Sequence, residues 1–461
     1  MIEKDIVILG GGPGGYVAAL HAAHLGARVA LIEKDKLGGT CLNCGCIPTK
    51  ALAKSVEVFQ EASKAEEFGI ETGGVRANFQ KIMERKDRLI TGLVGGVEQL
   101  LKMSGVTIFR GSGRIVSPRL VKVNDDEITA GKIIIATGSM PALLPVPGGD
   151  LPGVYNTDGI LELKELPKRL VIIGGGYVGA EFACIFSGLG TKVTVVEMLP
   201  MCLATSDDEI CKFFSRSVRR LRIDVKTGTA VKSIVKGGDR LKVVCGAPAG
   251  EQTIEGEAVL LAAGRVPYAG GLNLSELGIE MDRRAIKVND YLETSVPGIY
   301  AIGDVTGKVM LAHVASYQGE IAVENALGRS ARAADYGAVP SCIFTRPEMA
   351  SVGMTEKDAK ERGIDCKISK FPFSACSRAA TVNETMGLVK IISGTGDGRV
   401  LGMHIIGPNA SELIAQGTLA VRMGLTAEQI AHTIHAHPTL SEAIHEAAMG
   451  CDGFPIHFQK L

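Results

Sequence analysis

Short apolar runs that end in glycine recur along the chain and predict the strands of an α/β protein. Residues 5–9 are apolar and β-branched, residues 10–15 are glycine-rich, and an alanine-rich stretch then continues to Gly26. A second apolar run, 29–32, ends at Glu33. This order predicts a strand, a tight turn, a helix and a second strand.

The same pattern occurs twice, because residues 170–197 align without a gap on residues 6–33. One glycine run can arise by chance, whereas two with matched acids rarely do. Two dinucleotide-binding units are therefore predicted. The alignment places Gly174, Gly176, Gly179 and Glu197 on Gly10, Gly12, Gly15 and Glu33.

The glycines of each unit fit G-x-G-x-x-G, in which the missing side chains let the first amides of a helix approach a pyrophosphate. The acid that follows the second strand is placed to accept a hydrogen bond from a ribose hydroxyl. In the second unit Glu197 would repel a 2′-phosphate, and residues 198–201 contain no Arg to receive one. The second unit is therefore predicted to bind NAD rather than NADP.

Outside these units the pattern is less regular. Residues 57–102 predict helix, residues 106–128 predict short strands, and 133–135 is a fully apolar strand. Pro and Gly residues at 141–149 mark a domain boundary. Another apolar strand, 259–263, closes the second unit.

A strand predicted over residues 293–305 ends in Gly303 and Asp304. An acid at the carboxyl end of a strand in an open α/β sheet lies where ligands bind. Asp304 is therefore a candidate contact to a ribose or ribityl chain, and it could also cap a helix.

From about Cys342 the glycine fingerprint is absent. Strands at 387–393 and 400–407, followed by two helical stretches, predict a third domain of the interface type. The fold class expected is α/β, with two Rossmann-like dinucleotide-binding domains and a C-terminal α+β domain. The expected segments are 1–148 and 270–340 for the first dinucleotide-binding domain, 149–269 for the second, and 341–461 for the C-terminal domain.

Composition narrows the class of protein. The chain has 461 residues, is 46% hydrophobic, and contains 58 Gly and no Trp, which is typical of an α/β enzyme. Its net charge is zero without blocks of like charge, so neither nucleic acid nor a membrane is an expected partner. The N-terminus lacks a secretory signal, and eleven scattered cysteines suit a reducing compartment. A bacterial cytoplasm, or a mitochondrial matrix after removal of a transit peptide, is expected.

Three cysteines, Cys41, Cys44 and Cys46, stand within six residues beside two glycines. Thiols this close can exchange electrons by making and breaking a disulfide, so the spacing favours a redox centre. The alternative is a metal site with three soft ligands. Structural zinc usually takes a fourth ligand, and no second Cys or His pair with suitable spacing occurs elsewhere in the sequence. No metal is therefore expected.

A histidine-rich stretch near the C-terminus is the second candidate for chemistry. Pro438 prevents a helix from extending back through His437, and Thr439 or Ser441 can cap a helix that begins there. Glu442 would then lie in the first turn. A carboxylate that fixes one imidazole nitrogen makes the other a better base, so spacing alone favours a catalytic and a structural role equally.

Together these motifs resemble the FAD-dependent pyridine-nucleotide disulfide oxidoreductases, and most closely the dihydrolipoamide dehydrogenases among them. The resemblance covers nearly the whole chain, and it implies oxidation of dihydrolipoamide to lipoamide with NAD⁺ as electron acceptor. It rests on the paired fingerprints and on segments 39–43, 45–48, 136–138, 300–304 and 437–442.

The resemblance implies that Cys41 and Cys46 form the redox disulfide, with Cys41 exchanging with substrate and Cys46 lying against the flavin. Cys46 is expected to open a helix whose dipole stabilises its thiolate, and Pro48 suits the first turn. His437, held by Glu442, would deprotonate the dithiol at the disulfide of the other subunit.

The resemblance also implies contacts to two cofactors, FAD and NAD. Lys50 and Glu181 are expected to pair near the flavin, and Asp304 to hold the ribityl chain. The helix that begins near Ala312 would point its N-terminus at the flavin. The cofactor contacts expected in all are Gly10, Gly12, Gly15, Glu33, Thr40, Lys50, Thr137, Gly138, Asp304 and Ala312, and Gly174, Gly176, Gly179, Glu197 and Gly264.

The partners implied by the family are a second copy of the chain, in a homodimer formed through the C-terminal domain, and lipoyl carrier proteins. These carriers belong to 2-oxo acid dehydrogenase or glycine cleavage systems. Cys44 departs from the family, which usually has Val there, and it is either inert packing or a third exchanging thiol. Thr49, Tyr268 and Cys376 are further departures.

Three alternatives stay open. Glutathione-type reductases share the cysteine motif but use NADPH, which Glu197 and Gly179 disfavour. Mercuric reductases carry an adjacent cysteine pair at the tail, where this chain has only Cys451. A thiol redox sensor or metal-binding protein without turnover is the alternative outside this class of enzyme.

Overall fold

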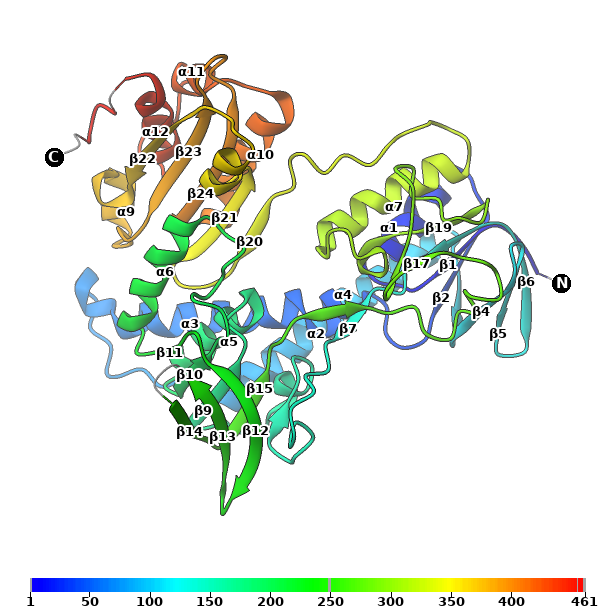
Figure 1. Ribbon diagram of the computed structural model, residues 1–461, viewed down its shortest axis with the longest axis horizontal. Helices are drawn as coiled ribbons and strands as arrows, with labels where there is room; N and C mark the ends of the chain where they lie inside the picture. The colour runs from blue at the N-terminus through cyan, green and yellow to red at the C-terminus, as the bar shows by residue number, and fades with distance from the viewer. Residues whose placement is uncertain (1, 248–249, 454, 459–461) are drawn as a thin grey trace. The chain divides into compact units, whose positions relative to one another are not determined.

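The computed structural model describes residues 2–247, 250–453 and 455–458, and Figure 1 shows the chain from blue at the N-terminus to red at the C-terminus. It contains two compact units. No helix in these described ranges is both long enough and apolar enough to span a membrane. The first unit comprises Met1–Leu144, Asn156–Glu165 and Ala263–Ala334, and the second comprises Pro145–Tyr155, Leu166–Ala262 and Asp335–Leu461. The domain boundaries predicted from the sequence stay a prediction.

The first unit is built on a sheet in the order β3-β2-β1-β6-β5-β4, with β19 beside β6. Strands β3, β2, β1, β6 and β19 are parallel, and β4 and β5 add an antiparallel edge. The strands are β1 (Ile2–Leu9), β2 (Val29–Glu33), β3 (Thr107–Arg110), β4 (Gly113–Ser117), β5 (Leu120–Val123), β6 (Asp126–Ile135) and β19 (Ile299–Ala301).

Alternate residues of β1 enter the two cores of this unit, as the two-residue period of a strand requires. Ile6 and Ile8 pack with helices α1 (Pro13–His24) and α7 (Ala312–Ala326), whereas Val7 and Leu9 face the opposite core. Both faces of the strand are therefore buried, which explains its continuous apolar run.

The helical region predicted over 57–102 is two long helices with a break. The backbone turns at Gly69 and Gly74, both of which have positive φ, so the region does not form a single helix. The helices are α2 (Gly39–Cys44), α3 (Cys46–Ser63), η1 (Ala65–Phe68) and α4 (Phe79–Met103).

The strand predicted over 293–305 is shorter than expected, because Pro297 and Gly298 (φ +85°) interrupt it before β19. Asp304 lies in the first turn of η3 (Gly303–Thr306), whose N-cap is Ile302. Asp304 is therefore not the cap of this helix. The remaining elements of the first unit are β7 (Ser139–Pro141), η2 (Gly159–Glu162), β16 (Arg265–Pro267), β17 (Met281–Asp282) and β18 (Ala285–Ile286).

The second unit contains a parallel sheet in the order β11-β10-β9-β15-β8 and a separate antiparallel sheet β12-β13-β14. Two parallel sheets that alternate with helices confirm the α/β class. The elements are β8 (Val154–Tyr155), β9 (Arg169–Ile173), α5 (Tyr177–Gly188), β10 (Lys192–Val196), α6 (Asp208–Arg220), β11 (Asp224–Lys226), β12 (Ala230–Gly237), β13 (Arg240–Ala247), β14 (Gly250–Gly256) and β15 (Ala258–Leu261).

The C-terminal part of the second unit is an antiparallel sheet, β20-β21-β24-β23-β22, covered by helices over a core that includes Phe371, Phe373 and Met403. The expectation of two helices after the last strand was wrong, because three follow it: Gly424 (φ +66°) ends the first, and a Thr426 capping box starts the second. The elements are β20 (Ser341–Ile343), β21 (Glu348–Gly353), α8 (Glu356–Glu361), β22 (Cys366–Pro372), η4 (Phe373–Ala375), α9 (Ser377–Thr381), β23 (Leu388–Gly394), β24 (Val400–Gly407), α10 (Ala410–Met423), α11 (Ala427–Ala431) and α12 (Glu442–Asp452).

Candidate active site

The first glycine-rich turn joins β1 to α1 and brings backbone segments very close together. Gly10 has φ +106°, and a Cβ there would overlap the carbonyl oxygen of Ala136. A Cβ at Gly15 would overlap the carbonyl oxygen of Gly10. Gly12 is the N-cap of α1, and no side chain caps this helix. The first amides of α1 therefore face a cradle that any side chain would fill.

The second glycine-rich turn, between β9 and α5, repeats this geometry. Gly174 has φ +109°, and a Cβ at Gly179 would overlap the Gly174 carbonyl oxygen. Gly176 is the N-cap of α5, again without a capping side chain. The gap-free alignment of the two sequences thus corresponds to two turns of the same shape.

The two acids also occupy equivalent positions. Glu33 accepts the amide of Gly11 at 2.6 Å, and Glu197 accepts the amide of Gly175 at 2.5 Å. The other oxygen of each carboxylate accepts the amide two residues further on, at 2.8 Å and 2.7 Å. Each acid therefore joins the glycine-rich turn to the loop that follows the acid's own strand. The contacts of the two acids to a ribose stay a prediction.

The three cysteines lie on either side of Gly45, the single residue that separates helices α2 and α3. Cys41 and Cys44 are in α2, and Cys46 is the first residue of α3, as predicted. Gly45 joins the helices with φ −133° and ψ −108°, and a Cβ there would lie 2.9 Å from the carbonyl oxygen of Thr40. The short contact explains why glycine is needed between the two thiol-bearing helices.

Cys41 and Cys46 are close enough for their side chains to hydrogen bond, and both are in the thiol form. That hydrogen bond, together with burial, raises the pKa of Cys41, while the charge of Lys50 opposes the shift. The helix dipole favours a thiolate at Cys46 because it begins α3. The structure thus brings together the two thiols that were predicted to exchange, in the dithiol state.

Cys44 has a different environment from the other two thiols. Burial raises its pKa to about 12, with Asp158 adding to the shift and Arg265 opposing it. A thiol that holds its proton so tightly is a poor nucleophile. Within the described residues, no group of three or more Cys, His, Asp or Glu side chains is arranged to hold a metal ion.

A polar network connects the redox segment to the predicted ribityl contact. Asp304 accepts a hydrogen bond from Ser139 at 2.5 Å, and Ser139 accepts one from Arg265 at 2.8 Å. The Arg265 guanidinium also donates to Thr40 at 3.1 Å. Ser139 and Arg265 were missed as site residues. The signal was weak, since only the Gly264-Arg265 pair after an apolar strand pointed to them.

The strand ends near this network are fixed by backbone contacts. Thr137 donates its hydroxyl to the carbonyl of Tyr268 at 2.6 Å, and the Gly138 carbonyl accepts the Tyr268 amide at 2.9 Å. Gly264, with φ +95°, accepts the amide of Ala142 at 3.0 Å. The three predicted positions, Thr137, Gly138 and Gly264, all belong to the first unit.

Helix α7 begins at Ala312, as the sequence indicated, and it crosses α1 closely. A Cβ at Gly319 would lie 2.8 Å from the carbonyl oxygen of Gly14, so only glycine allows this approach. The buried side chain of Gln318 accepts the Gly303 amide at 2.6 Å, which fixes the turn that carries Asp304. Both helices therefore start on the same side of the unit as the first glycine-rich turn.

His437 and Glu442 form the predicted dyad. The Nδ1 atom of His437 lies 2.8 Å from Glu442 Oε1, and the imidazole side chain is 71% exposed. Burial raises the pKa of Glu442, but the amide of Thr439 and the imidazole of His437 outweigh it, so the pKa lies below its usual value. The carboxylate is thus charged and holds one nitrogen of an accessible imidazole.

The predicted cap of α12 was wrong. Ser441 occupies the N-cap position, but its backbone is helical and its side chain makes no capping bond. Its hydroxyl lies 2.7 Å from that of Thr439 instead. Glu442 Oε2 accepts the Thr439 amide at 2.8 Å, so the acid itself stabilises the start of the helix.

Glu181 lies on α5 of the second unit and is buried, where its carboxylate accepts the amide of Phe344 at 2.9 Å. Lys50 lies on α3 of the first unit, one turn after Cys46. The predicted Lys50–Glu181 pair stays a prediction, and so does the approach of His437 to the cysteines.

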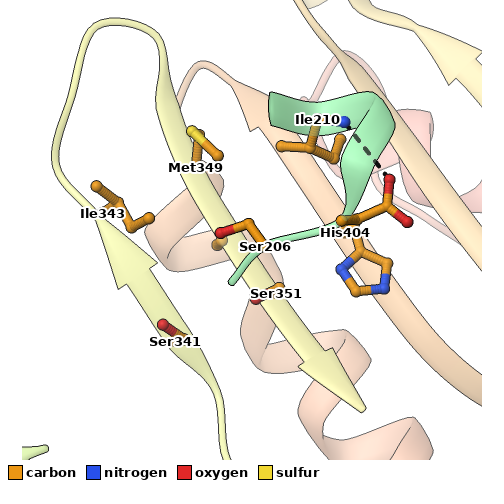
Figure 2. Close-up of a pocket in the computed structure, with 9 residues that line it drawn as sticks. Ser206, Ile210, Ser341, Ile343, Met349, Ser351 and His404 are labelled. Atoms are coloured by element: carbon orange, nitrogen blue, oxygen red, sulfur yellow. Dashed lines mark hydrogen bonds between the residues drawn. The ribbon is translucent and has the colours of Figure 1, made fainter. Parts of the chain in front are cut away.

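The second unit also contains a small buried pocket that the sequence did not indicate. Figure 2 shows Ser206, Ile210, Met349, Ser351 and His404 around it. Its volume is about 10 Å³, which is the size of one water molecule and far too small for a nucleotide.

His404 is almost fully buried beside this pocket. Its Nε2 atom lies 2.9 Å from the carbonyl oxygen of Met354, and Nδ1 has no hydrogen-bond partner within the part of the chain that the structure describes. Burial lowers the pKa of this imidazole, which therefore stays neutral near neutral pH.

Lys390, also buried, holds the start of α6 against the C-terminal sheet. Its Nζ atom bonds both oxygens of Asp207 at 3.0 Å and Glu356 at 2.8 Å, and it lies 3.3 Å from Glu209. Asp207 is itself the N-cap of α6. This cluster stabilises the packing of α6 on the sheet, and no local sequence pattern predicts it.

The first unit fits FAD and the second fits NAD in the features that the structure shows. Each has a glycine cradle before an uncapped helix, and each fixes an acid beside the turn. The first adds Thr40, Thr137 and Asp304 within one connected region.

Comparison with known proteins agrees with this arrangement. A family model described as "Pyridine nucleotide-disulphide oxidoreductase" matches residues 4–319, and one described as the dimerisation domain of the same family matches residues 339–448. A dihydrolipoyl dehydrogenase of Bacillus subtilis is 41% identical over 471 residues, covering 99% of each chain. The mitochondrial dihydrolipoyl dehydrogenase of Pisum sativum is 44% identical over 465 residues, covering 99% of this chain and 93% of that one.

Solved structures with the same fold include LpdA of Mycobacterium tuberculosis, with a TM-score of 0.90 at 30% identity, covering 97% of this chain and 99% of that one. The HOCl-induced flavoprotein disulfide reductase RclA of Escherichia coli gives a TM-score of 0.88 at 30% identity, covering 96% and 99%.

Proposed function

The chain belongs to the pyridine nucleotide-disulphide oxidoreductase family, and from that premise we propose that it is a dihydrolipoyl dehydrogenase. It oxidises dihydrolipoamide to lipoamide with NAD⁺ as the acceptor, and its cofactors are FAD and NAD. The observation that carries the proposal is the neighbouring pair of thiols, Cys41 and Cys46, at the start of a helix in a chain whose full-length relatives have this activity.

The first step is removal of a proton from the substrate dithiol. The exposed face of His437 carries Nε2, while Glu442 holds Nδ1 at 2.8 Å. The carboxylate fixes the orientation of the ring and stabilises the imidazolium that forms. His437 of one subunit serves the disulfide of its partner in a homodimer built through the C-terminal domain.

The second step is exchange at sulfur. The substrate thiolate attacks Sγ of Cys41, the Cys41–Cys46 bond breaks, and Cys46 leaves as a thiolate at the N-terminus of α3. The second substrate thiol then attacks the mixed disulfide and releases lipoamide.

FAD, when bound, would supply the two-electron chemistry that links the Cys41–Cys46 dithiol to NAD⁺. Asp304, fixed by Ser139 and Arg265, would hold the ribityl chain of this cofactor. The natural substrate is the lipoyl group of a carrier protein in a 2-oxo acid dehydrogenase or glycine cleavage system. The named relatives come from bacteria and from mitochondria, and either compartment suits this role.

The test is His437→Gln in the purified holoenzyme. Dihydrolipoamide oxidation should slow by about 10²-fold or more, the usual scale for loss of a general base. Reduction of an artificial acceptor by NADH, which needs no dithiol deprotonation, should be retained. His435→Gln is the matched control, and an unchanged rate in His437→Gln would exclude the residue as the base.

The alternatives within the family are separated by substrate. We expect dihydrolipoamide with NAD⁺ to be preferred over glutathione disulfide or Hg(II) with NADPH. Purified protein without flavin absorbance, or with bound zinc and no dithiol oxidation, would support a sensor or metal-binding role instead.

A further inference from the structure

Helix α12 holds two imidazoles in the same way. Glu442 and Glu446 are four residues apart, so they project from one face of the helix. Glu442 Oε1 binds His437 Nδ1 at 2.8 Å, and Glu446 Oε1 binds His457 Nδ1 at 2.7 Å. The second oxygen of each carboxylate accepts a backbone amide, from Thr439 and from His457 itself, at 2.8 Å and 3.3 Å.

The second pair differs from the first in burial. Glu446 is only 6% exposed, whereas Glu442 is 28% exposed. Both imidazoles are open to solvent, at 70% for His457 and 71% for His437. A carboxylate that is buried to this extent needs a partner, and His457 supplies it from the C-terminal tail.

The tail has a second attachment beside His457. The ring of Phe458 meets buried Phe371 of β22 edge to face, with centroids 6.3 Å apart and planes at 78°. His457 is therefore held over α12 by two contacts of different kinds. The imidazole cannot be regarded as a freely moving surface group.

The charge of His457 affects Glu442, the carboxylate of the dyad. It contributes, after Thr439 and His437, to lowering the pKa of Glu442 against the opposing effect of burial. Other charged groups near α12 have partners at a distance from the dyad, such as Lys367 with Asp452 at 2.6 Å. Besides Glu442 and Glu446, the titratable and charged groups on α12 and on the elements packed against it are Cys366, Lys367 and Lys370 of β22, Lys390 of β23, Glu428 of α11, and His445, Cys451 and Asp452 of α12 itself.

We propose that His457 is a positioning residue for proton transfer, which clasps Glu446 and sets the charge on the face of α12 that carries the His437–Glu442 dyad. This inference rests on the proposed function. A cationic His457 offsets part of the negative charge of the two carboxylates. Without this positive charge the face of α12 is more negative, which favours the protonated form of the dyad and moves the acid limb of the activity profile to higher pH.

The experiment compares His457→Asn with wild-type holoenzyme. Asn can still donate a hydrogen bond to Glu446 from the position of Nδ1, but it carries no charge. The acid limb of the pH–rate profile for dihydrolipoamide oxidation should move to higher pH by roughly half a unit. Lys367→Gln, which removes a positive charge at the other end of α12, should leave the limb in place.

A second readout follows the tail without using activity. Carboxypeptidase Y digestion, followed by mass spectrometry, should trim His457→Ala several-fold faster than wild type, whereas His457→Asn should be protected like wild type. The Ala variant should show the same shift of the acid limb, since it too lacks the charge.

Superimposable profiles for His457→Asn and wild type would overturn the proposal, because the tail contact alone would then suffice. Equal trimming of His457→Ala and wild type would contradict the clasp. Wild-type enzyme without dihydrolipoamide oxidation would overturn the proposed function as well, so the two failures are distinguishable.

Discussion

The two glycine-rich turns have the same backbone and different surroundings. Gly10 and Gly174 have φ of +106° and +109°, and each acid accepts the same pair of amides. The first turn is covered by the redox segment, because a Cβ at Gly39 would lie 2.7 Å from the Cα of Gly12. At Gly176, the equivalent of Gly12, a Cβ would meet nothing within 4 Å among the described residues.

This difference suits two kinds of ligand. A turn packed against the thiols suits a cofactor that stays bound through every cycle. A turn beside exposed side chains, such as Tyr177 and Met198, which are 46% and 68% exposed, suits a coenzyme that enters and leaves. The two turns therefore share one local motif, and the segment that covers the first turn distinguishes their surroundings.

The substitutions with the largest expected effect place a side chain in each glycine-rich turn. Gly10→Ala would overlap the Ala136 carbonyl and strain a φ of +106°, so FAD should be lost and activity should fall by about 10³-fold or more. Gly174→Ala should keep its yellow colour and raise the KM for NAD⁺ by about 10- to 100-fold. Absorbance spectra and steady-state kinetics check both, and flavin loss from Gly174→Ala would contradict the assignment.

A more local substitution displaces only the redox segment that packs against the first turn. Gly39→Ala would push α2 away from Gly12, so we expect kcat to fall by about tenfold and the flavin spectrum to change. Gly92→Ala, on α4 with open space around it, is the matched control and should behave like wild type. A normal spectrum in Gly39→Ala would mean that the contact is not needed.

Substitution of each acid should weaken the binding of a different cofactor. Glu197→Ala removes the acceptor for two amides, and the KM for NAD⁺ should rise about tenfold while the preference over NADP⁺ falls. Glu33→Ala should instead weaken flavin retention, measured by ultrafiltration. Identical effects of the two substitutions would remove the distinction between the sites.

The smallest expected effect concerns acid stability of the second unit. Burial places the folded-state pKa of His404 below its usual value, so the unfolded chain binds a proton more readily. Stability is therefore lost as the pH falls below about 6.5, the unfolded value. The melting temperature should drop more between pH 7.5 and 5.5 in wild type than in His404→Asn, and equal slopes would show that His404 does not titrate on unfolding.

Local motifs were predictable and long-range contacts were not. The glycines, their acids and the helix that begins at Cys46 follow from spacing over fewer than thirty residues. The chain of Ser139 and Arg265 depends on β7 pairing with β16 across more than a hundred residues, which no period reveals. The cap of α12 failed for another reason, because the Ser441 hydroxyl pairs with that of Thr439 and Glu442 accepts the Thr439 amide.

The junction at Gly45 makes the number of residues between Cys41 and Cys46 as important to the redox segment as its glycines and cysteines. Residue types within it can vary, as Cys44 and Thr49 do here. One residue inserted in α3 just after Cys46 would turn Cys46 by about 100° around the helix axis relative to the rest of α3, and carry its sulfur away from Cys41. Grafts between relatives should therefore tolerate new side chains at positions such as 44 and 49, but neither the loss of Gly39 or Gly45 nor a change in the residue count.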